Sequence, residues 1–309
     1  MNITNSTECP SQELHPIIPA FLGIFSVAGL VFNAFSLWIF WFALKRWNSS
    51  IMLQFNLALV DTMILPVTPL MVTYFSMGND WPFGEFLCQF EAFTLSTHLY
   101  GSIYFLTLIS IHRYQVIVHY KAKTLWRSKS FLKKLIMAFW TILLLQGLPI
   151  FFFLKTSVID GKVKCLSIHQ TELSYVFLLY GIVLGTFSFF LPFSISLVSY
   201  MMLGSYIRKI SPVNLQGRVM KTKSVQMIVV TFLIFAICFM PLHVFRTAGT
   251  VVKYYNHSCR FLHYVEVAYY ISLVFTTVNC CLDPFIYNFA NERFNKSFST
   301  SLRRLLFSK

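Results

Sequence analysis

The sequence predicts an all-α membrane protein, a seven-transmembrane helix bundle that ends in a short amphipathic cytosolic helix. Of the 309 residues, 56% are hydrophobic and 34 are Phe, which is more apolar surface than a soluble domain of this length needs for its core. The apolar residues form seven runs of around 20 or more residues each. Most of the basic residues lie between alternate runs, as expected for the cytosolic loops of a membrane protein.

Each run is long enough to cross the bilayer as a helix, in which the backbone polar groups are satisfied within the segment. The runs cover about residues 17–44, 51–77, 86–118, 132–154, 173–207, 219–253 and 262–288. Prolines lie inside several runs, where neighbouring helices can satisfy the freed carbonyl groups. The chain therefore divides into an extracellular N-terminus (1–16), the bundle (17–288) and a cytosolic helix 8 with a short tail (289–309).

The distribution of charge predicts the orientation of the bundle. Nineteen of the 25 Lys and Arg residues lie in the segments 45–50, 113–134, 206–223 and 291–309, which places these segments in the cytosol. We therefore expect a multi-pass protein of the plasma membrane with its N-terminus outside. The net charge of +14 does not indicate nucleic-acid binding, because the charges lie between apolar runs and no basic module with stacking aromatics accompanies them. The basic loop 120–134 could contact a cytosolic protein or anionic membrane lipids.

The N-terminus and the outer loops contain residues at which covalent modification is expected. Asn2 and Asn5 begin N-x-Ser/Thr sequons on the outer side. Four cysteines are also predicted outside: Cys9, Cys88, Cys165 and Cys259. An oxidising compartment and an even number suggest two disulfides, for which three connectivities exist. The remaining cysteines are expected to be small buried hydrophobes: Cys238, Cys280 and Cys281.

The second outer loop contains a hairpin signal. Strand-forming residues flank Asp160 and Gly161, a dipeptide typical of a two-residue turn. We expect a hairpin that roofs the outer end of the bundle. In the first outer loop, Trp81 could be simply an interfacial anchor.

The outer part of the sixth run gives the sharpest signal for a binding site. His243 and Arg246 are three residues apart, hence on one helix face, just beyond Pro241. A guanidinium there can grip a carboxylate or phosphate in bidentate fashion, although an arginine near a span end can also extend to the headgroups. Lys155 has the same two interpretations. The third run has no carboxylate facing the expected pocket, with Glu91 one turn above, which argues against a site for a protonated amine.

Motifs along nearly the whole chain resemble those of a rhodopsin-like (class A) G-protein-coupled receptor. The matching positions are Asn33, Asp61, Cys88, Arg113, Trp140, Cys165, Pro192, Tyr200, Pro241, Asp283, Pro284, Tyr287 and Phe294. The resemblance implies a disulfide between Cys88 and Cys165, activation of heterotrimeric G proteins, and arrestin as a further partner. It also implies a coupling end made of Arg113, Tyr114, Tyr200 and Tyr287.

A narrower resemblance concerns the ligand. The Pro-x-His-x-x-Arg pattern at 241–246, the Trp-Pro-Phe-Gly run at 81–84 and the pairing of Cys9 with Cys259 are similar to the purinergic-receptor-like branch. That branch includes nucleotide, cysteinyl-leukotriene, succinate, oxoglutarate and lysophospholipid receptors, whose ligands are anionic. The implied ligand-binding residues are Tyr100, Lys155, His243, Arg246 and Tyr269. Since Tyr269, Tyr270 and Leu273 stand where the branch often has another cation, a lipid or amphiphile with one acidic group is favoured over a di- or triphosphate.

The same resemblance implies a sodium-binding cavity in the middle of the bundle. Its residues would be Asp61, Ser102, Asn279 and Asp283, and two carboxylates with oxygen donors suit a hard cation. A shared proton or a water cluster is the competing interpretation. Beyond this allosteric Na⁺ we expect no cofactor and no metal, because the histidines show no metal-ligand spacing.

One departure from the family pattern is His112, which stands where the family has an acid before the arginine. In the family this acid pairs with the arginine and restrains the inactive state, and a histidine cannot replace it. We therefore expect raised basal activity, unless other packing compensates. The alternative is an orphan or scavenger-type seven-transmembrane receptor with little G-protein coupling.

Other classes fit the sequence less well. A light-activated opsin needs a Schiff-base lysine in the seventh run, and residues 262–288 contain none. A transporter or channel favours internal repeats, which are not visible here. An enzyme would need a nucleophile–base or metal constellation, and none is evident, so we expect a protein that is not an enzyme.

Overall fold

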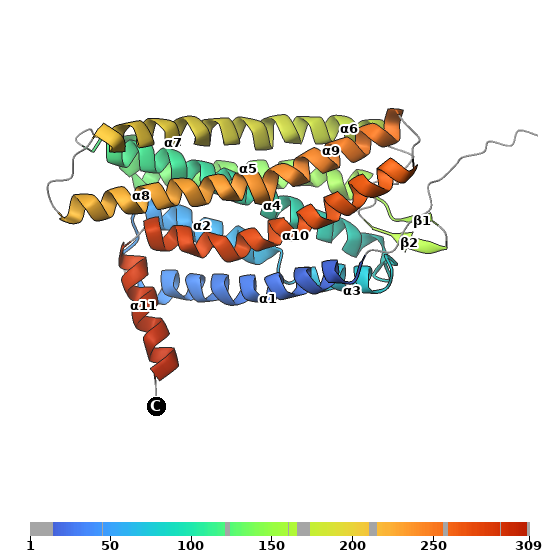
Figure 1. Ribbon diagram of the computed structural model, residues 1–309, viewed down its shortest axis with the longest axis horizontal. Coiled ribbons are helices and arrows are strands. Elements are labelled where there is room, and N and C mark those ends of the chain that lie inside the picture. Colours follow the sequence, from blue (N-terminus) through green and yellow to red (C-terminus); the bar gives the residue numbers. More distant parts are fainter. Residues whose placement is uncertain are drawn as a thin grey trace, which may run out of the picture.

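The computed structural model describes residues 15–44, 46–120, 124–159, 161–165, 174–209, 215–255, 259–290 and 292–307. Within these residues seven helical spans run side by side along the long axis of the molecule, and a C-terminal helix lies across one end (Figure 1). The spans are Ile17–Ala43, Ser49–Ser76, Gly84–Val118, Lys129–Phe153, Leu178–Lys209, Gly217–Val252 and Cys259–Tyr287. The predicted all-α seven-transmembrane fold is confirmed.

Several spans consist of two consecutive helices. The helices are α1 Ile17–Trp38, α2 Ser49–Met63, α3 Thr68–Ser76, α4 Gly84–Val118, α5 Lys129–Phe153, α6 Ser174–Val183, α7 Leu191–Lys209, α8 Leu215–Leu233, α9 Met240–Tyr255, α10 Cys259–Ala290 and α11 Glu292–Phe307. The second span breaks between α2 and α3, where Pro66 has no N–H to continue the helical ladder. The observed ends differ from the predicted ones by only a few residues.

Prolines also shape the fifth and sixth spans. A π-helical segment, Leu184–Phe190, precedes Pro192, and a second one, Ile234–Phe239, precedes Pro241. A proline ring clashes with the carbonyl four residues earlier, and the wider π-helical turn relieves that clash. Each segment lies near the middle of its span, and Figure 1 shows the sixth span changing direction between α8 and α9.

The central helix α4 contacts α2, α5 and α7. Gly101 lets α4 approach α2 closely, because a Cβ at this position would lie 2.9 Å from Val60 Cγ1 and 3.4 Å from Leu143 Cδ1. The next residue, Ser102, donates a hydrogen bond to Asp61 Oδ1 on α2 at 2.9 Å. The small residue and the polar contact thus belong to one helix crossing.

We expect Gly101→Ala to destabilise the bundle by about 1–3 kcal/mol, because the added methyl group forces Val60 and the backbone of α2 to shift. The matched control is Gly181→Ala on α6, where a Cβ would meet nothing within 4 Å. That change should leave stability unchanged or raise it slightly. Thermal unfolding of the two purified variants in detergent measures the difference, and equal midpoints would contradict the tight crossing.

The outer end of the bundle carries the predicted hairpin. Strand β1, Ser157–Ile159, pairs antiparallel with β2, Lys162–Lys164, and Gly161 has a φ of 76°, which a hairpin turn of this kind requires. The Cys88–Cys165 disulfide joins the end of the hairpin to the start of α4, which confirms the pairing implied by the family resemblance. Figure 1 places this hairpin at the opposite end of the bundle from α11.

The hairpin is docked on the first outer loop. Val163 accepts a hydrogen bond from the backbone N–H of Trp81 at 2.8 Å and donates its own N–H to Asp80 Oδ1 at 2.9 Å. The side chain of Trp81 is 1% exposed and its Nε1–H donates to the carbonyl of Gly84 at 2.8 Å. The expectation that Trp81 is an interfacial anchor was therefore wrong: it is a core residue that supports the hairpin.

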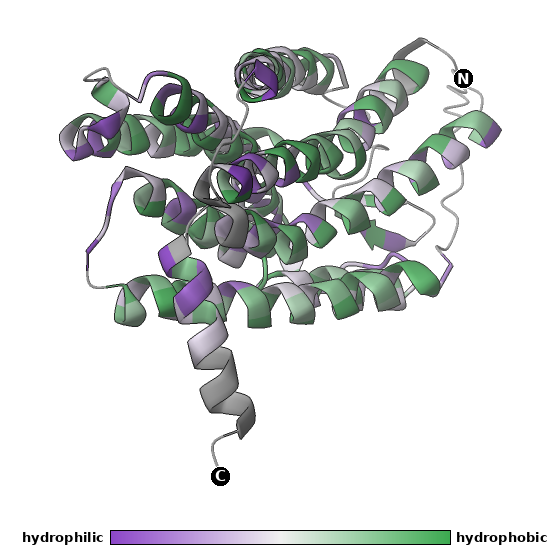
Figure 2. Ribbon diagram, turned by 60° about the vertical axis from the view of Figure 1, so that its left-hand side comes forward, coloured by the Kyte–Doolittle hydropathy of each residue, from purple (hydrophilic) through white to green (hydrophobic). Residues whose placement is uncertain are grey.

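Most residues of the spans are apolar, as their colour in Figure 2 shows, and many of the large ones are exposed on the outside of the bundle. Among the large exposed side chains are Trp41, Phe42, Phe152 and Phe187. At the other end of the bundle, α11 is amphipathic and lies across the helix ends (Figure 1). Its Phe294 is fully buried against Phe40 and Tyr287, at ring distances of 4.8 and 5.7 Å.

Candidate ligand site and polar core

The candidate ligand site begins with His243, one turn inward of Arg246 on α9. The imidazole is 6% exposed and stacks on Phe189 with ring centroids 4.3 Å apart. Its other ring neighbour is Tyr100 on α4, at 5.6 Å. His243 Nε2 is buried without a hydrogen-bond partner. The aromatic rings thus fix the orientation of the imidazole and leave one polar atom available.

Arg246 lies in a ring of tyrosines. Its guanidinium interacts with the phenol groups of Tyr100, Tyr180 and Tyr269, from α4, α6 and α10. No ion pair within 4.0 Å joins Arg246 to a carboxylate of the described residues. The structure therefore brings His243, Arg246, Tyr100 and Tyr269 together, and their role in ligand binding stays a prediction. Lys155 is exposed just beyond the end of α5.

Two buried carboxylates, each beside a tyrosine of α10, were not part of the predicted site. Glu91 on α4 is 2% exposed, its Oε2 has no hydrogen-bond partner, and it interacts electrostatically with Tyr269. Glu266 on α10 is 8% exposed and accepts a hydrogen bond from the hydroxyl of Tyr270 at 3.2 Å. Glu91 was visible in the sequence as an acid near the outer end of its span, but only the packing of α4 against α10 reveals its neighbour.

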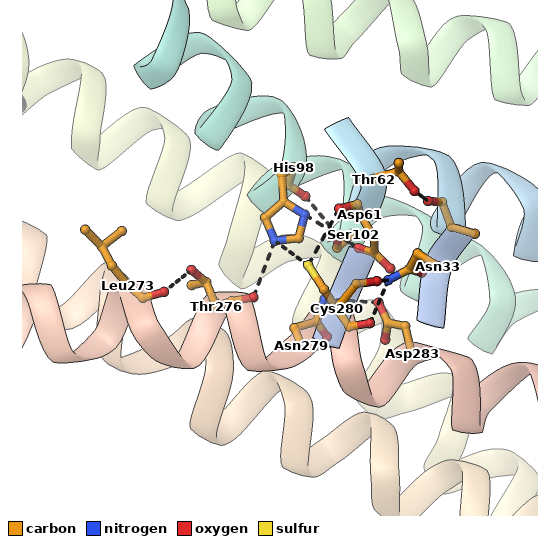
Figure 3. A network of polar contacts seen from close by, with 12 residues as sticks. Asn33, Asp61, Thr62, His98, Ser102, Leu273, Thr276, Asn279, Cys280 and Asp283 are labelled. Atoms are coloured by element: carbon orange, nitrogen blue, oxygen red, sulfur yellow. Dashed lines mark hydrogen bonds and ion pairs between the residues drawn. The ribbon is translucent and has the colours of Figure 1, made fainter. Parts of the chain in front are cut away.

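Four predicted residues form a polar network in the middle of the bundle (Figure 3). Ser102 donates a hydrogen bond to Asp61 Oδ1 at 2.9 Å, and Asn279 Nδ2 donates to Asp283 Oδ2 at 3.0 Å. Asn33 Nδ2 ties α1 to this network through the carbonyl of Cys280 at 2.7 Å. All of these side chains are fully buried.

Several oxygens of this network remain without partners. Asp61 Oδ2, Asn279 Oδ1 and Asp283 Oδ1 are buried and accept no hydrogen bond from the protein. Buried acceptors of this kind require a cation, a proton or ordered water. The donor set therefore fits the sodium ion that the family resemblance implies, and it fits a water cluster equally well.

His98 and Cys280 also belong to this network, although no pattern in the sequence connects them. His98 Nδ1 lies 3.5 Å from Asp61 Oδ1, and His98 Nε2 lies 3.7 Å from Cys280 Sγ and 3.4 Å from the carbonyl of Thr276 (Figure 3). The carboxylate, imidazole and thiol atoms all lie within 4.8 Å of one another. The residues come from three different helices, so no local spacing in the sequence could reveal the group.

The end of the bundle near α11 contains the residues predicted for G-protein coupling. Two nitrogens of Arg113, Nε and one Nη, are buried without hydrogen-bond partners. The guanidinium interacts with Tyr200, whose hydroxyl lies 3.3 Å from Thr231 Oγ1 on α8. His112 is 6% exposed, and its charged neighbours are the cations Arg113 and Arg127.

The remaining two coupling residues lie in different surroundings. Tyr114 contacts His119 at the end of α4, with a distance of 3.4 Å between its hydroxyl and a ring nitrogen. Tyr287 is fully buried, and its hydroxyl interacts electrostatically with Asp61 and Asp283 without forming a hydrogen bond of ordinary geometry. The structure therefore groups Tyr287 with the polar network.

Some predicted modification sites cannot be located. Asn2, Asn5 and Cys9 lie outside the described residues. Cys259, at the start of α10, is disulfide-bonded. Its pairing with Cys9 stays a prediction, as does glycosylation of Asn2 and Asn5. Cys238, Cys280 and Cys281 are free thiols.

Comparison with known proteins agrees with this architecture. Residues 32–287 match the family described as "7 transmembrane receptor (rhodopsin family)". Purinoceptor 2 of Homo sapiens is 34% identical over 278 residues, which cover 90% of this chain and 74% of that receptor. Purinoceptor 4 of Mus musculus is 32% identical over 283 residues, covering 90% and 77% of the two chains. Purinoceptor 3 of Gallus gallus is 30% identical over 299 residues, covering 95% and 90%.

These matches confirm the resemblance seen in the motifs. They also confirm that the chain is a receptor and not an enzyme. Membership of this family implies coupling to G proteins. Seven spans make the chain a multi-pass membrane protein. The chain belongs to the rhodopsin-like (class A) family of G-protein-coupled receptors and is similar to the purinoceptors of that family.

Proposed function

We propose that this receptor acts at the plasma membrane, where it binds an extracellular anionic ligand and activates heterotrimeric G proteins, with arrestin as a further cytosolic partner. Residues 1–16 form the extracellular N-terminus, with Asn2 and Asn5 glycosylated, and residues 289–309 form the cytosolic helix and tail. The observation that carries the proposal is Arg246, a partly buried guanidinium surrounded by phenol groups and without a carboxylate partner among the described residues.

A cation in this setting favours an anionic ligand. A carboxylate or phosphate would receive a bidentate hydrogen bond from Arg246 and a further one from His243 Nε2, which has no partner within the protein. Tyr100 and Tyr269 would direct hydroxyl groups to the same anion. Lys155, on the surface beyond α5, would attract anions toward the outer end of the bundle.

The charges nearby favour a ligand with a single acidic group. Glu91 is buried beside Tyr269, one of the tyrosines that surround Arg246, so a di- or triphosphate would bring several negative charges close to an acidic side chain. A lipid or another amphiphile would instead place its apolar part against the Phe and Tyr side chains. A nucleotide is the second candidate, since the names of the relatives designate them as purinoceptors.

Activation would follow from a population shift. A ligand that binds Arg246 on α9 and Tyr100 on α4 better in the active arrangement would pull α9 toward α4. Because the π-helical segment Ile234–Phe239 bends this span, the inner helix α8 would move outward in response. That movement would break the contact between Tyr200 and Thr231 and expose Arg113, Tyr114 and Tyr287 to the G protein.

The decisive experiment measures G-protein activation in cells across nucleotides, lysophospholipids, eicosanoids and dicarboxylates. For the active compound, Arg246→Ala should lower potency by about 30-fold or more, because losing one partner of a charged pair costs about 2 kcal/mol or more. Arg246→Lys should retain part of the response, since the charge remains but bidentate geometry is lost. Variants are compared at matched surface expression.

The control is Arg260→Ala, which removes an exposed cation at the start of α10 that has no place in the proposed ligand site and should change potency only slightly. Equal potency of the wild type and Arg246→Ala would overturn the proposed ligand site. A high basal signal without any response would indicate a constitutive receptor. Silence of every variant would favour the alternative, an orphan or scavenger-type receptor with little coupling.

A further inference from the structure

We propose that Asp61, His98 and Cys280 form a binding site for a transition-metal ion of the zinc type. The three residues come from α2, α4 and α10, and one carboxylate oxygen, one ring nitrogen and the sulfur lie within 4.8 Å of one another. Each of the three residues is at most 1% exposed. Figure 3 shows the imidazole between the carboxylate and the thiol, directed at both.

The chemistry of the donors separates this site from a sodium site. A thiolate and an imidazole are preferred ligands of Zn²⁺, whereas Na⁺ takes oxygen atoms. The oxygens that would hold a hard cation belong to Asp61, Ser102, Asn279 and Asp283. Only Asp61 is common to the two sets, so substitutions can distinguish them.

Unsatisfied polar atoms also point to a ligand at this position. Asp61 Oδ2 and His98 Nδ1 are both buried and have no hydrogen-bond partner within the protein. A buried polar atom without a partner costs free energy, which coordination would recover. Of the three thiols that are free, only that of Cys280 belongs to such a group in the described residues.

The distances suit coordination after a small rearrangement. In a tetrahedral zinc site the ligand atoms lie about 3.5 Å apart. Here His98 Nδ1 lies 3.5 Å from Asp61 Oδ1, and His98 Nε2 lies 3.7 Å from Cys280 Sγ. Because different ring nitrogens face the two partners, the imidazole must turn about its Cβ–Cγ bond to direct one nitrogen at the ion. A water molecule or the nearby carbonyl of Thr276 would take the fourth position.

An ion held by three spans would act on the receptor as an allosteric ligand. It would bind the arrangement in which α2, α4 and α10 meet and would stabilise that arrangement relative to others. Zinc binding also requires that the Cys280 thiol lose its proton to solvent. The proposal is independent of the extracellular ligand and of G-protein coupling, so neither is needed to test it.

The test is thermal unfolding of the purified full-length receptor in detergent, titrated with ZnCl₂ or with NaCl. We expect ZnCl₂ to raise the Tm of the wild type in a saturable manner. Cys280→Ser and His98→Asn should lose this shift while keeping the response to NaCl. Ser102→Ala should show the opposite pattern, with the zinc shift retained and the sodium shift reduced.

The matched control is Cys281→Ser, which changes the adjacent, half-buried thiol that contacts the carbonyl of Phe25 and should keep the full zinc shift. A zinc shift of equal size in Cys280→Ser and the wild type would overturn the proposal, as would no shift in the wild type. If Cys280→Ser does not fold, Co²⁺ added to the wild type and to Cys281→Ser decides the question. A thiolate-to-cobalt absorption band in both supports the site, and its absence from both overturns it.

Discussion

Replacement of both Cys88 and Cys165 by Ser is expected to destabilise the receptor by about 2–5 kcal/mol and to reduce its surface expression strongly. The disulfide spans 77 residues of sequence and joins the hairpin to the start of α4. Cross-linking residues so far apart removes much conformational freedom from the unfolded chain, and breaking the link restores that freedom. Changing both cysteines together avoids a single thiol that could mispair.

Thermal unfolding in detergent and surface labelling of intact cells measure the two effects. Cys281→Ser is the control, because Cys281 is a free thiol and serine can still donate to the carbonyl of Phe25. In the double variant the hairpin keeps its hydrogen bonds to Asp80 and Trp81. We expect that these bonds alone cannot compensate for the lost disulfide. Unchanged stability and expression would show that they can.

Substitution of His112 by Asp is expected to lower basal G-protein signalling by roughly tenfold. Arg113 has two buried nitrogens without hydrogen-bond partners, and the charged neighbours of His112 are both cations. A carboxylate at position 112 could accept a hydrogen bond from Arg113, and a bond to a charged group contributes about 1.5–3 kcal/mol. That contribution would favour the inactive arrangement, and about 1.4 kcal/mol corresponds to a factor of ten in population.

Basal activity is measured without added ligand, at matched surface expression. His112→Asn is the control of similar size: it adds no charge and should leave the basal signal near that of the wild type. Equal signalling by the wild type and His112→Asp would mean that other packing restrains the receptor. A reduction in both variants would assign the effect to the loss of the imidazole instead of the gain of an acid.

Features encoded by local patterns could be predicted from the sequence. Hydrophobic runs and the distribution of charge gave the seven spans, because a helix in lipid must satisfy its backbone within a contiguous segment. The turn at Gly161 followed from the conformational freedom of glycine. His243 and Arg246 could be placed on one face from the sequence, because both lie on one helix and are three residues apart.

Features that depend on packing between helices were missed. Trp81 could have been an interfacial anchor, yet it is buried with the rings of Tyr74 and Phe83 beside it. Glu91 could not be related to Tyr269, nor His98 to Cys280, since each pair joins α4 to α10 across more than 170 positions of sequence. The partner of a buried polar side chain is chosen by the helix crossing, which hydrophobic periodicity does not determine.

In the proposed orientation, the packing of α11 would couple the inner leaflet of the membrane to the receptor. Phe294 of α11 packs on Tyr287, and Tyr287 in turn faces the carboxylates of the polar network. A displacement of Tyr287 would therefore move Phe294 and with it α11, and a displacement of α11 would move Tyr287. Because Arg293 and Lys296 are exposed on this helix, anionic headgroups would hold it at a particular depth. Lipid composition and receptor state would then be thermodynamically linked, with each able to bias the other.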